Sequence, residues 1–213
     1  MRTEILSAAQ SDVLERLKGL PEIEAFYLAG GTALALRIGH RRSIDFDFFT
    51  AGDFDAIDLR ERLLTVFGEV PIRSQARRTL YVTLFGVTTS FFAYRYPLLE
   101  PAEATLWGFG LAGLRDIAAM KIEAVAGRGS RKDFIDLYFL CRQFDLRDIF
   151  RFFAEKYRGA GADPYHRLRA LAHFDDAEAE PMPDMLAPLE WEEVRRFFAT
   201  RARALWESGT DLP

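Results

Sequence analysis

Two aspartates at alternate positions of a short apolar segment are the residues of this chain best suited to chemistry. Asp45 and Asp47 alternate with Ile44, Phe46 and Phe48. Successive side chains of a strand point to opposite faces, so both carboxylates are expected on one face and the three apolar side chains in a core. Two like charges held together repel unless a cation lies between them. Carboxylate oxygens suit Mg²⁺, so the pair predicts a metal site.

A glycine pair precedes these aspartates, at the end of a buried strand predicted for Ala25–Ala29. Gly30 and Gly31 let backbone N–H groups approach an anion that a side chain would keep away. Thr32 is expected to cap a helix over Ala33–Ile38. A Gly-Gly turn alone, or a single Asp-x-Asp strand, more often serves structure only. Their order here favours a phosphate cradle followed by a metal-binding pair.

A second Asp-x-Asp has a simpler interpretation. Asp53 and Asp55 precede a helical pattern over Ile57–Phe67. Asp is favoured at a helix N-cap and in the first turn, where its charge complements the helix dipole. We therefore assign this pair no chemistry.

A further group of charged residues lies in the helical part of the chain. Lys121 stands in mid-helix among apolar residues, which suits either the edge of a cleft or a lysine whose ammonium reaches solvent. Asp133 follows Ser130 at the spacing of a capping box, and Asp136 lies one turn further on the same side. Asp133 is therefore either a helix cap or part of a site.

The two blocks together resemble the nucleotidyltransferase superfamily, and in detail the AbiEii/AbiGii family, the toxins of bacterial abortive-infection and toxin-antitoxin systems. The first block is GGTALALRIGHRRSIDFDFF. The second runs from Ala119-Met120-Lys121 through Arg128 to Arg131-Lys132-Asp133-Phe134-Ile135-Asp136-Leu137-Tyr138. The resemblance covers residues 22–140 and fades afterwards.

The resemblance implies a reaction in which an acceptor attacks the α-phosphorus of a nucleoside triphosphate (NTP) and pyrophosphate leaves. Asp45 and Asp47 would be catalytic ligands of Mg²⁺. Lys121 would offset charge on the triphosphate, and Asp133 would orient or deprotonate the acceptor with support from Asp136. The residues implied in nucleotide binding are Gly30, Gly31, Thr32, Arg41, Arg42, Ser43, Arg128 and Arg131.

One departure from the family pattern stands out. Many nucleotidyltransferases have a third metal-binding carboxylate on a later strand, whereas the matching segment here, Thr88–Tyr94, contains no acid. Three explanations are open. Asp133 or Asp136 replaces the ligand, or one metal ion suffices, or the domain binds nucleotide without turning it over.

The remaining pattern predicts two domains in a chain of 213 residues. Residues 1–105 are expected to form a nucleotidyltransferase-like α/β domain, with a mixed sheet and flanking helices. Residues 106–213 are expected to form a helical domain that completes the active-site cleft. The expected strands are Glu69–Ser74, Leu80–Phe85 and Thr88–Tyr96. The chain is expected to reverse at Gly86, and the sheet is expected to end at Pro97 and Pro101. The expected helices are Thr3–Lys18, Arg131–Phe144, Leu146–Arg158, Pro164–His173 and Glu190–Glu207.

Composition limits the possible partners. The net charge of −4 argues against indiscriminate nucleic-acid binding, although local basic clusters leave room for a basic rim around a metal site. The single cysteine, Cys141, excludes an intramolecular disulfide, and neither a signal peptide nor a membrane span is recognisable, so a cytoplasmic location is expected. The resemblance implies an NTP, an RNA acceptor such as a tRNA end, and a cognate antitoxin or regulator as partners. Two rivals are an enzyme that modifies a partner protein, which the acidic charge favours, and a non-catalytic nucleotide-binding protein.

Overall fold

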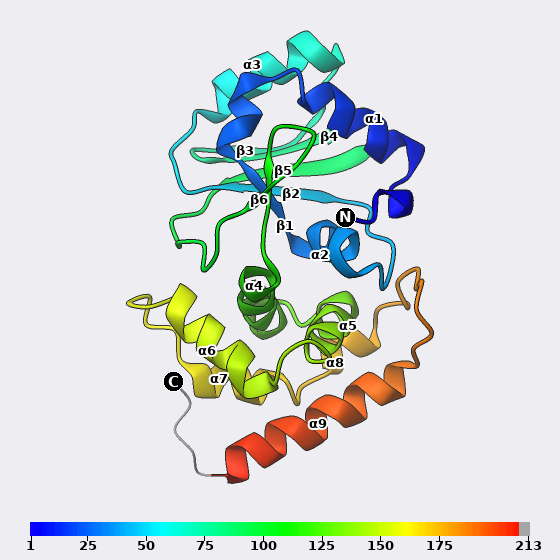
Figure 1. Ribbon diagram of the computed structural model, residues 1–213, viewed down its shortest axis with the longest axis vertical. Helices are drawn as coiled ribbons and strands as arrows, with labels where there is room; N and C mark the ends of the chain where they lie inside the picture. The colour runs from blue at the N-terminus through cyan, green and yellow to red at the C-terminus, as the bar shows by residue number, and fades with distance from the viewer. Residues whose placement is uncertain (209–213) are drawn as a thin grey trace. The chain divides into compact units, whose positions relative to one another are not determined.

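A computed structural model describes residues 1–208, and it divides into two compact units (Figure 1). The first, here called the sheet unit, comprises Met1–Ile38 and Arg42–Gly113. The second, here called the helical unit, comprises Gly39–Arg41 and the chain from Leu114 onward. The last five positions of the predicted helical domain, residues 209–213, lie outside the described residues.

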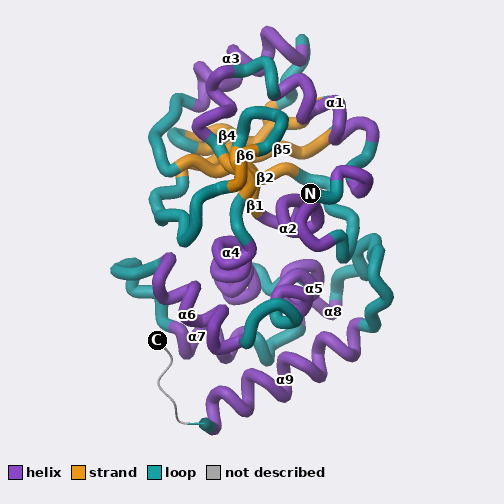
Figure 2. Tube along the Cα trace, viewed as in Figure 1, coloured by secondary structure: helices purple, strands orange, loops and turns teal. Residues whose placement is uncertain are grey.

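The sheet unit is built on one mixed sheet with the strand order β3-β4-β5-β2-β1-β7-β6. β2 runs antiparallel to β1 and parallel to β5, which confirms the predicted mixed α/β class. Figure 2 shows the strands gathered in this unit. The strands are β1 (Tyr27–Ala29), β2 (Phe46–Thr50), β3 (Ile72–Ala76), β4 (Thr79–Leu84), β5 (Val87–Ala93), β6 (Glu103–Ala104) and β7 (Gly110–Leu111).

The alternation predicted for the aspartate segment holds within β2. Phe46 and Phe48 are fully buried, whereas Asp47 is half-buried on the other face. The prediction for Ile44 is wrong, because its exposed fraction is 76%. β2 begins only at Phe46, so the period-two pattern does not extend to Ile44 in the preceding loop.

Two turn predictions have different outcomes. The reversal at Gly86 is confirmed: Phe85 and Gly86, with φ of 47° and 81°, form a two-residue turn that pairs Leu84 with Val87. Positive φ at both positions gives the twist that a tight hairpin needs. The expected end of the sheet at the prolines is wrong, because β6 and β7 follow them and add an edge next to β1.

Helices cover both faces of this sheet. In Figure 1, α1 (Ala8–Leu17) and α3 (Ala56–Phe67) lie over one face and α2 (Gly30–Ile38) over the other. Asp55 caps α3 by accepting hydrogen bonds from the N–H groups of Ile57 and Asp58, as predicted. The expected helix over Thr3–Lys18 is divided, because Ser7 forms a capping box with Gln10 and starts α1 afresh after the short 3-10 helix Thr3–Ile5.

The helical unit packs α4 against α5, α6 and α7. A fully buried ion pair of 2.6 Å between Asp116 on α4 and Lys156 on α6 links two of these helices. Phe134 and Phe198 are buried where α5 meets α9, with ring centroids 5.7 Å apart. The helices are α4 (Leu114–Gly127), α5 (Arg131–Leu140), α6 (Leu146–Lys156), α7 (Pro164–Ala170), α8 (Asp175–Glu178) and α9 (Trp191–Glu207).

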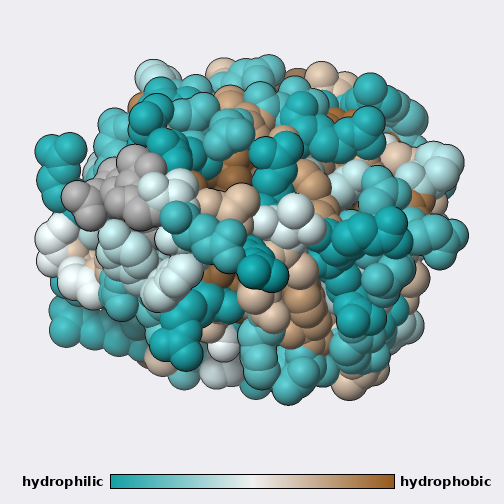
Figure 3. All heavy atoms as spheres, turned by 90° about the horizontal axis from the view of Figure 1, so that it is seen from below, coloured by the Kyte–Doolittle hydropathy of each residue, from teal (hydrophilic) through white to brown (hydrophobic). Residues whose placement is uncertain are grey.

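The surface mixes polar and apolar residues. Figure 3 shows one face on which hydrophilic residues predominate and hydrophobic ones gather near the middle. Single exposed hydrophobic residues such as Leu186, at 43%, and Trp206, at 55%, are ordinary on protein surfaces. Over the residues that the structure describes, none of the helices has the length and apolar character that crossing a bilayer requires.

Candidate functional site

The glycine pair lies where β1 passes directly into α2. Gly30 has a φ of 69°, and a Cβ built on it would stand 2.6 Å from Oδ2 of Asp47. Both the left-handed backbone and this close approach require glycine. The antiparallel register pairs Ala29 with Asp47, so the carboxylate faces the junction between strand and helix.

The predicted helix cap at Thr32 is wrong, because α2 begins at Gly30 and contains Thr32. The side chain is 2% exposed, and its hydroxyl donates a hydrogen bond to the backbone carbonyl of Asp45. The sequence pattern placed the start of the helix too late because glycine is a poor helix former. Thr32 therefore anchors the segment that carries the first aspartate.

The loop before β2 is held by side chains from elsewhere in the sheet unit. Nε2 of Gln10 donates to the carbonyl of Ser43 at 2.8 Å. Arg42 donates to the carbonyl of Ile5 at 3.2 Å. With the bond from Thr32, these contacts fix the approach to Asp45, so the position of its backbone is determined by α1, α2 and the N-terminal segment.

The donor set around these aspartates is a pair of carboxylates. Asp47 lies opposite Ala29 on β1 and Ser90 on β5, and Ser90 lies opposite Tyr81 on β4, so none of these three strands adds an acid at this level. Among residues 1–208, no group of three or more His, Cys, Asp or Glu side chains could hold a metal ion. Mg²⁺ keeps several waters and takes substrate phosphate oxygens in such sites, so the carboxylate of Asp47 beside Gly30, with that of Asp45 two residues earlier in the chain, fits it by type of ligand.

A row of aromatic rings shares the sheet face of Asp47, a feature that sequence reasoning missed. Tyr27, Phe49 and Phe92 stack across three strands with centroid distances of 5.9 and 5.1 Å. Tyr81 meets Phe92 edge-on at 5.2 Å. The sequence does carry a signal for this row. Phe49 stands two positions after Asp47 and Phe92 two positions after Ser90, so each ring shares a strand face with that polar residue. Aromatic faces beside a nucleotide site can stack nucleobases.

Lys121 is buried in the helical unit, with an exposed fraction of 3%. Its ammonium lies 2.8 Å from Oδ1 of Asp133 and 2.6 Å from Oδ2 of Asp136. This excludes the interpretation of Lys121 as a lysine that reaches solvent. Its charge instead bridges the two carboxylates, which confirms that they lie on one side of α5.

Asp136 is fully buried and accepts four hydrogen bonds or ionic contacts. Arg41 donates to both carboxylate oxygens at 2.7 and 2.8 Å. His40 meets Oδ1 at 2.7 Å, and Lys121 completes the set on Oδ2. A carboxylate has about four lone-pair sites, so those of Asp136 are filled. His40, which sequence reasoning did not single out, gives no local signal beyond its place beside Arg41.

Asp133 is satisfied in the same way. Arg128 donates to both oxygens at 2.6 and 2.9 Å, and Lys121 donates to Oδ1. The capping-box prediction is wrong, because the hydroxyl of Ser130 donates to Asp133 Oδ2 at 2.7 Å. Two cations draw the carboxylate away from the helix terminus, since a charged donor is a stronger partner than a backbone N–H.

The charges of this cluster leave an excess of one positive charge: three cations, Arg41, Lys121 and Arg128, face the two carboxylates. Burial by itself would raise the pKa of Asp136 and Asp133, but the facing cations outweigh it and hold both pKa values well below the usual range. Burial lowers the pKa of His40, against the opposing influence of Asp136, so His40 is neutral at pH 7.

Arg131 and Cys141, also within the helical unit, are not members of this cluster. Nε of Arg131 donates to the carbonyl of Ala177 at 2.9 Å, and its guanidinium lies 4.9 Å from the ring centroid of Trp191, so it joins α5 to α8 and α9. Burial raises the pKa of Cys141 to about 12, which makes the thiol unreactive. Within the sheet unit Gly30, which precedes Gly31, adjoins the Asp47 carboxylate, and Thr32 bonds to the backbone of Asp45. Within the helical unit one cluster contains Arg41, Lys121, Arg128, Asp133 and Asp136.

Comparisons with known proteins agree with the motifs. The model of the family described as "Nucleotidyl transferase AbiEii toxin, Type IV TA system" matches residues 12–99 and 110–207. The chain is 41% identical over 208 residues to the uncharacterized protein aq_aa25 of Aquifex aeolicus (strain VF5), covering 95% of this chain and 98% of that protein.

Two solved structures share the fold. The nucleotidyltransferase toxin MenT4 from Mycobacterium tuberculosis H37Rv superposes with a TM-score of 0.58 at 19% identity, over 95% of this chain and 82% of that one. The antibiotic-resistance factor ANT(2'')-Ia superposes with a TM-score of 0.51 at 12% identity, over 70% of this chain and 91% of that one. Such identities show likeness of fold alone, and membership rests on the family model and the Aquifex relative. The chain therefore belongs to the AbiEii family of nucleotidyltransferase toxins.

Proposed function

We propose that this nucleotidyltransferase moves a nucleotide from an NTP to an RNA acceptor in a Mg²⁺-dependent reaction, as the toxin of a two-component module with a cognate antitoxin. The observation that carries the proposal is the approach of Gly30 to Asp47, 2.6 Å from a built Cβ to Oδ2. It joins backbone donors to a carboxylate in one place, which is the arrangement that a metal-bound triphosphate requires.

In this proposal the first turn of α2 binds the phosphates through the N–H groups of Gly30 and Gly31, which have no partners within the helix itself. Asp45 and Asp47 would hold Mg²⁺, which when bound neutralises phosphate charge and lowers the pKa of an attacking hydroxyl. Thr32 keeps Asp45 in place through its bond to the backbone carbonyl. Phe49 and Phe92 offer the nucleobase an aromatic surface on the same face.

The buried cluster of the helical unit has a separate role in the proposal. Because the acceptor sites of Asp133 and Asp136 are filled by cations and hydroxyl or imidazole groups, we propose that they hold Lys121, Arg41 and Arg128 rather than take a proton or bind metal. Of these three cations Arg128 has an exposed side chain, at 59%, and can meet an anion within the helical unit. Because the acceptor sites of Asp133 and Asp136 are filled, we assign Asp45 and Asp47 as the metal ligands.

A protein acceptor is the second candidate, since the net charge of −4 favours it over long nucleic acids. The test is incubation of the protein with each radiolabelled ribonucleoside triphosphate and Mg²⁺, with total tRNA or with the neighbouring gene product. Label on RNA supports the proposal, and label on protein supports the alternative. Transfer must disappear in Asp47→Asn and persist in Asp53→Asn, because Asp53 belongs to the other Asp-x-Asp and pairs with Arg78 at 2.6 Å.

A further inference from the structure

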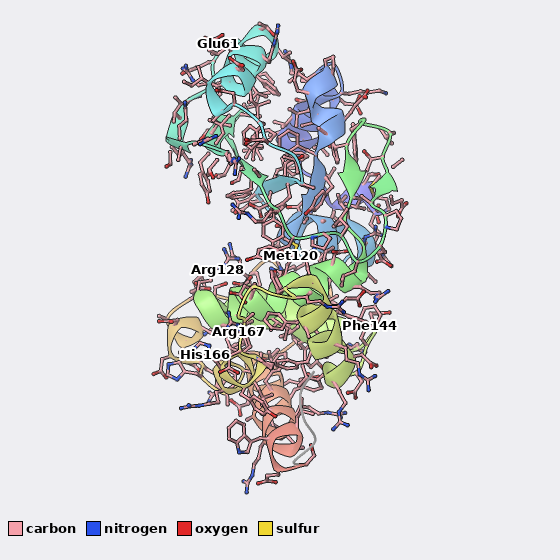
Figure 4. All side chains as sticks on the ribbon, turned by 90° about the vertical axis from the view of Figure 1, so that its left-hand side faces the viewer. Glu61, Met120, Arg128, Phe144, His166 and Arg167 are labelled. Carbon is pink, nitrogen blue, oxygen red and sulfur yellow. The ribbon has the colours of Figure 1, made fainter. Side chains whose placement is uncertain are left out.

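A pocket of about 370 Å³ lies within the helical unit, where the end of α4 meets α7. Its walls come from the last turn of α4, the turn at Arg128 and Gly129, and α7 from His166 onward with the residues that follow. Arg128 and His166, both labelled in Figure 4, contribute to it. The lining residues are Val125, Ala126, Gly127, Arg128, Gly129, His166, Arg169, Ala170, His173 and Asp176.

This pocket, here called the basic pocket, gathers nitrogen donors. Arg128, Arg169 and two of the three histidines of the chain line it, against one acid, Asp176. Arg128 also belongs to the buried cluster, so the two must be counted together: the cations Arg41, Lys121, Arg128 and Arg169 face the carboxylates Asp133, Asp136 and Asp176, which leaves one excess positive charge in a chain whose net charge is −4. A local positive charge with concave walls concentrates anions. The carbonyl end of α4 has the opposite polarity, so the side chains must carry any binding of an anion.

Asp133, which is not among the lining residues of the pocket, sets the orientation of Arg128. Its Nε and one terminal nitrogen bind Asp133 at 2.6 and 2.9 Å, which fixes the plane of the guanidinium although 59% of the side chain is exposed. A fixed guanidinium loses less entropy when it binds a phosphate than a mobile one does. Asp133 therefore connects the basic pocket to the buried cluster, because it bonds to both Arg128 and Lys121.

We propose that the basic pocket binds a backbone phosphate of a single-stranded RNA acceptor, an inference that rests on the proposed function. A phosphodiester carries one negative charge, which matches the excess of one. The pocket has no pair of carboxylates for a metal-bound triphosphate. Its volume is at the low end for ligand pockets and suits one nucleotide unit, with Val125 and Ala170 against the sugar.

The test measures binding of a fluorescein-labelled single-stranded RNA oligonucleotide to the full chain by anisotropy, without NTP or Mg²⁺. Arg169→Gln is expected to raise the Kd about fivefold and to lower the salt dependence of log Kd by about 0.7, the contribution of one phosphate on a single strand. His166→Gln is expected to weaken binding less. The matched control is Arg167→Gln, on the same helix but bound to Glu123 at 3.0 and 3.1 Å outside the pocket.

Three results would overturn the inference: wild-type protein that binds no RNA, Arg169→Gln with unchanged affinity, or an equal loss in Arg167→Gln, which would indicate general attraction. Melting temperatures of all variants identify any that fail to fold, and the exposed His166→Gln then serves in place of Arg169→Gln. Failure of the proposed function has a different signature. Wild-type protein would bind RNA through the pocket but transfer no nucleotide to it.

Discussion

Gly30 and Asp47 lie so close that a methyl group on the glycine would stand 2.6 Å from the carboxylate oxygen Oδ2. The contact joins the first residue of α2 to the second residue of β2, because Ala29, which precedes Gly30, is paired with Asp47. It places the carboxylate of Asp47 at the start of α2, where the first N–H groups of a helix have no partner within the helix.

Gly30→Ala is expected to lose NTP binding and to destabilise the sheet unit by more than a left-handed alanine alone, for which about 1–2 kcal/mol is typical. Gly68→Ala is the matched control: its φ is 73°, and of the described residues none lies within 4 Å of a built Cβ. Urea unfolding of both variants separates backbone strain from the collision with Asp47. An equal loss of unfolding free energy in Gly30→Ala and Gly68→Ala would mean that Asp47 moves away from the added methyl group.

Asp45→Asn and Asp47→Asn are each expected to abolish transfer while leaving the melting temperature in metal-free buffer unchanged or higher. Each removes one charge from the two aspartates that we propose as metal ligands, and like charges gathered at a metal site repel each other when the metal is absent. Melting curves with EDTA check the predicted stability, and transfer assays with Mg²⁺ check the predicted loss of activity. A large loss of stability in both variants would identify the aspartates as members of a structural network.

Lys121→Met is expected to destabilise the helical unit by about 3–5 kcal/mol, because it removes the buried ammonium that bonds to both Asp133 and Asp136, and a hydrogen bond to a charged group contributes about 1.5–3 kcal/mol. Lys132→Met, one residue before Asp133 and half-buried, is the control and should change stability little. Denaturant unfolding compares the two. If Lys121→Met proves as stable as the control, the cluster is solvated and the ion pairs are weak.

The pH dependence of stability should report on His40. Its folded pKa is lowered by burial from an unfolded value of 6.5, so the unfolded chain binds the proton more readily. The stabilising contribution is complete above pH 6.5 and is lost as the pH falls toward the folded value. The unfolding free energy of wild-type protein should therefore decrease below that pH, before Asp133 and Asp136 lose theirs at much lower pH.

His40→Gln is expected to remove this first decrease, since Gln can still donate to Asp136 but does not titrate. The measurement is urea unfolding of both proteins across the acid range. A wild-type protein that gains stability on acidification through the same range would show that His40 is protonated in the fold, and the assignment of a neutral imidazole would then be wrong.

Much of the sheet unit was predictable because its signals are local. The alternation of Asp47 with Phe46 and Phe48 follows from the pleat, and Asp55 caps α3 by a bond to its own neighbours. The helix boundary at Gly30 and the edge strands β6 and β7 were not predictable, since each depends on tertiary pairing that overrides local preference.

The buried cluster also depends on tertiary contacts that the local sequence does not reveal. Lys121, Asp133 and Asp136 could be singled out by type and spacing, but the partner that satisfies Asp136, Arg41, lies far away in the sequence. Ser130 and Asp133 have the spacing of a capping box and still bond to each other, because Lys121 and Arg128 compete for the carboxylate. Charge pairing over long sequence separations leaves no periodic signal in one sequence.

The central claim is that the junction at Gly30, with Asp45 and Asp47, binds a metal-bound triphosphate. Isothermal titration calorimetry of the wild-type protein with each of the four ribonucleoside triphosphates, with Mg²⁺ and with EDTA, tests it most directly. We predict that at least one triphosphate binds with Mg²⁺, and that EDTA or Asp47→Asn weakens binding at least about tenfold, as expected when a phosphate charge loses its metal. Absence of binding under every condition, or binding that is the same in Asp47→Asn as in the wild type, would contradict it.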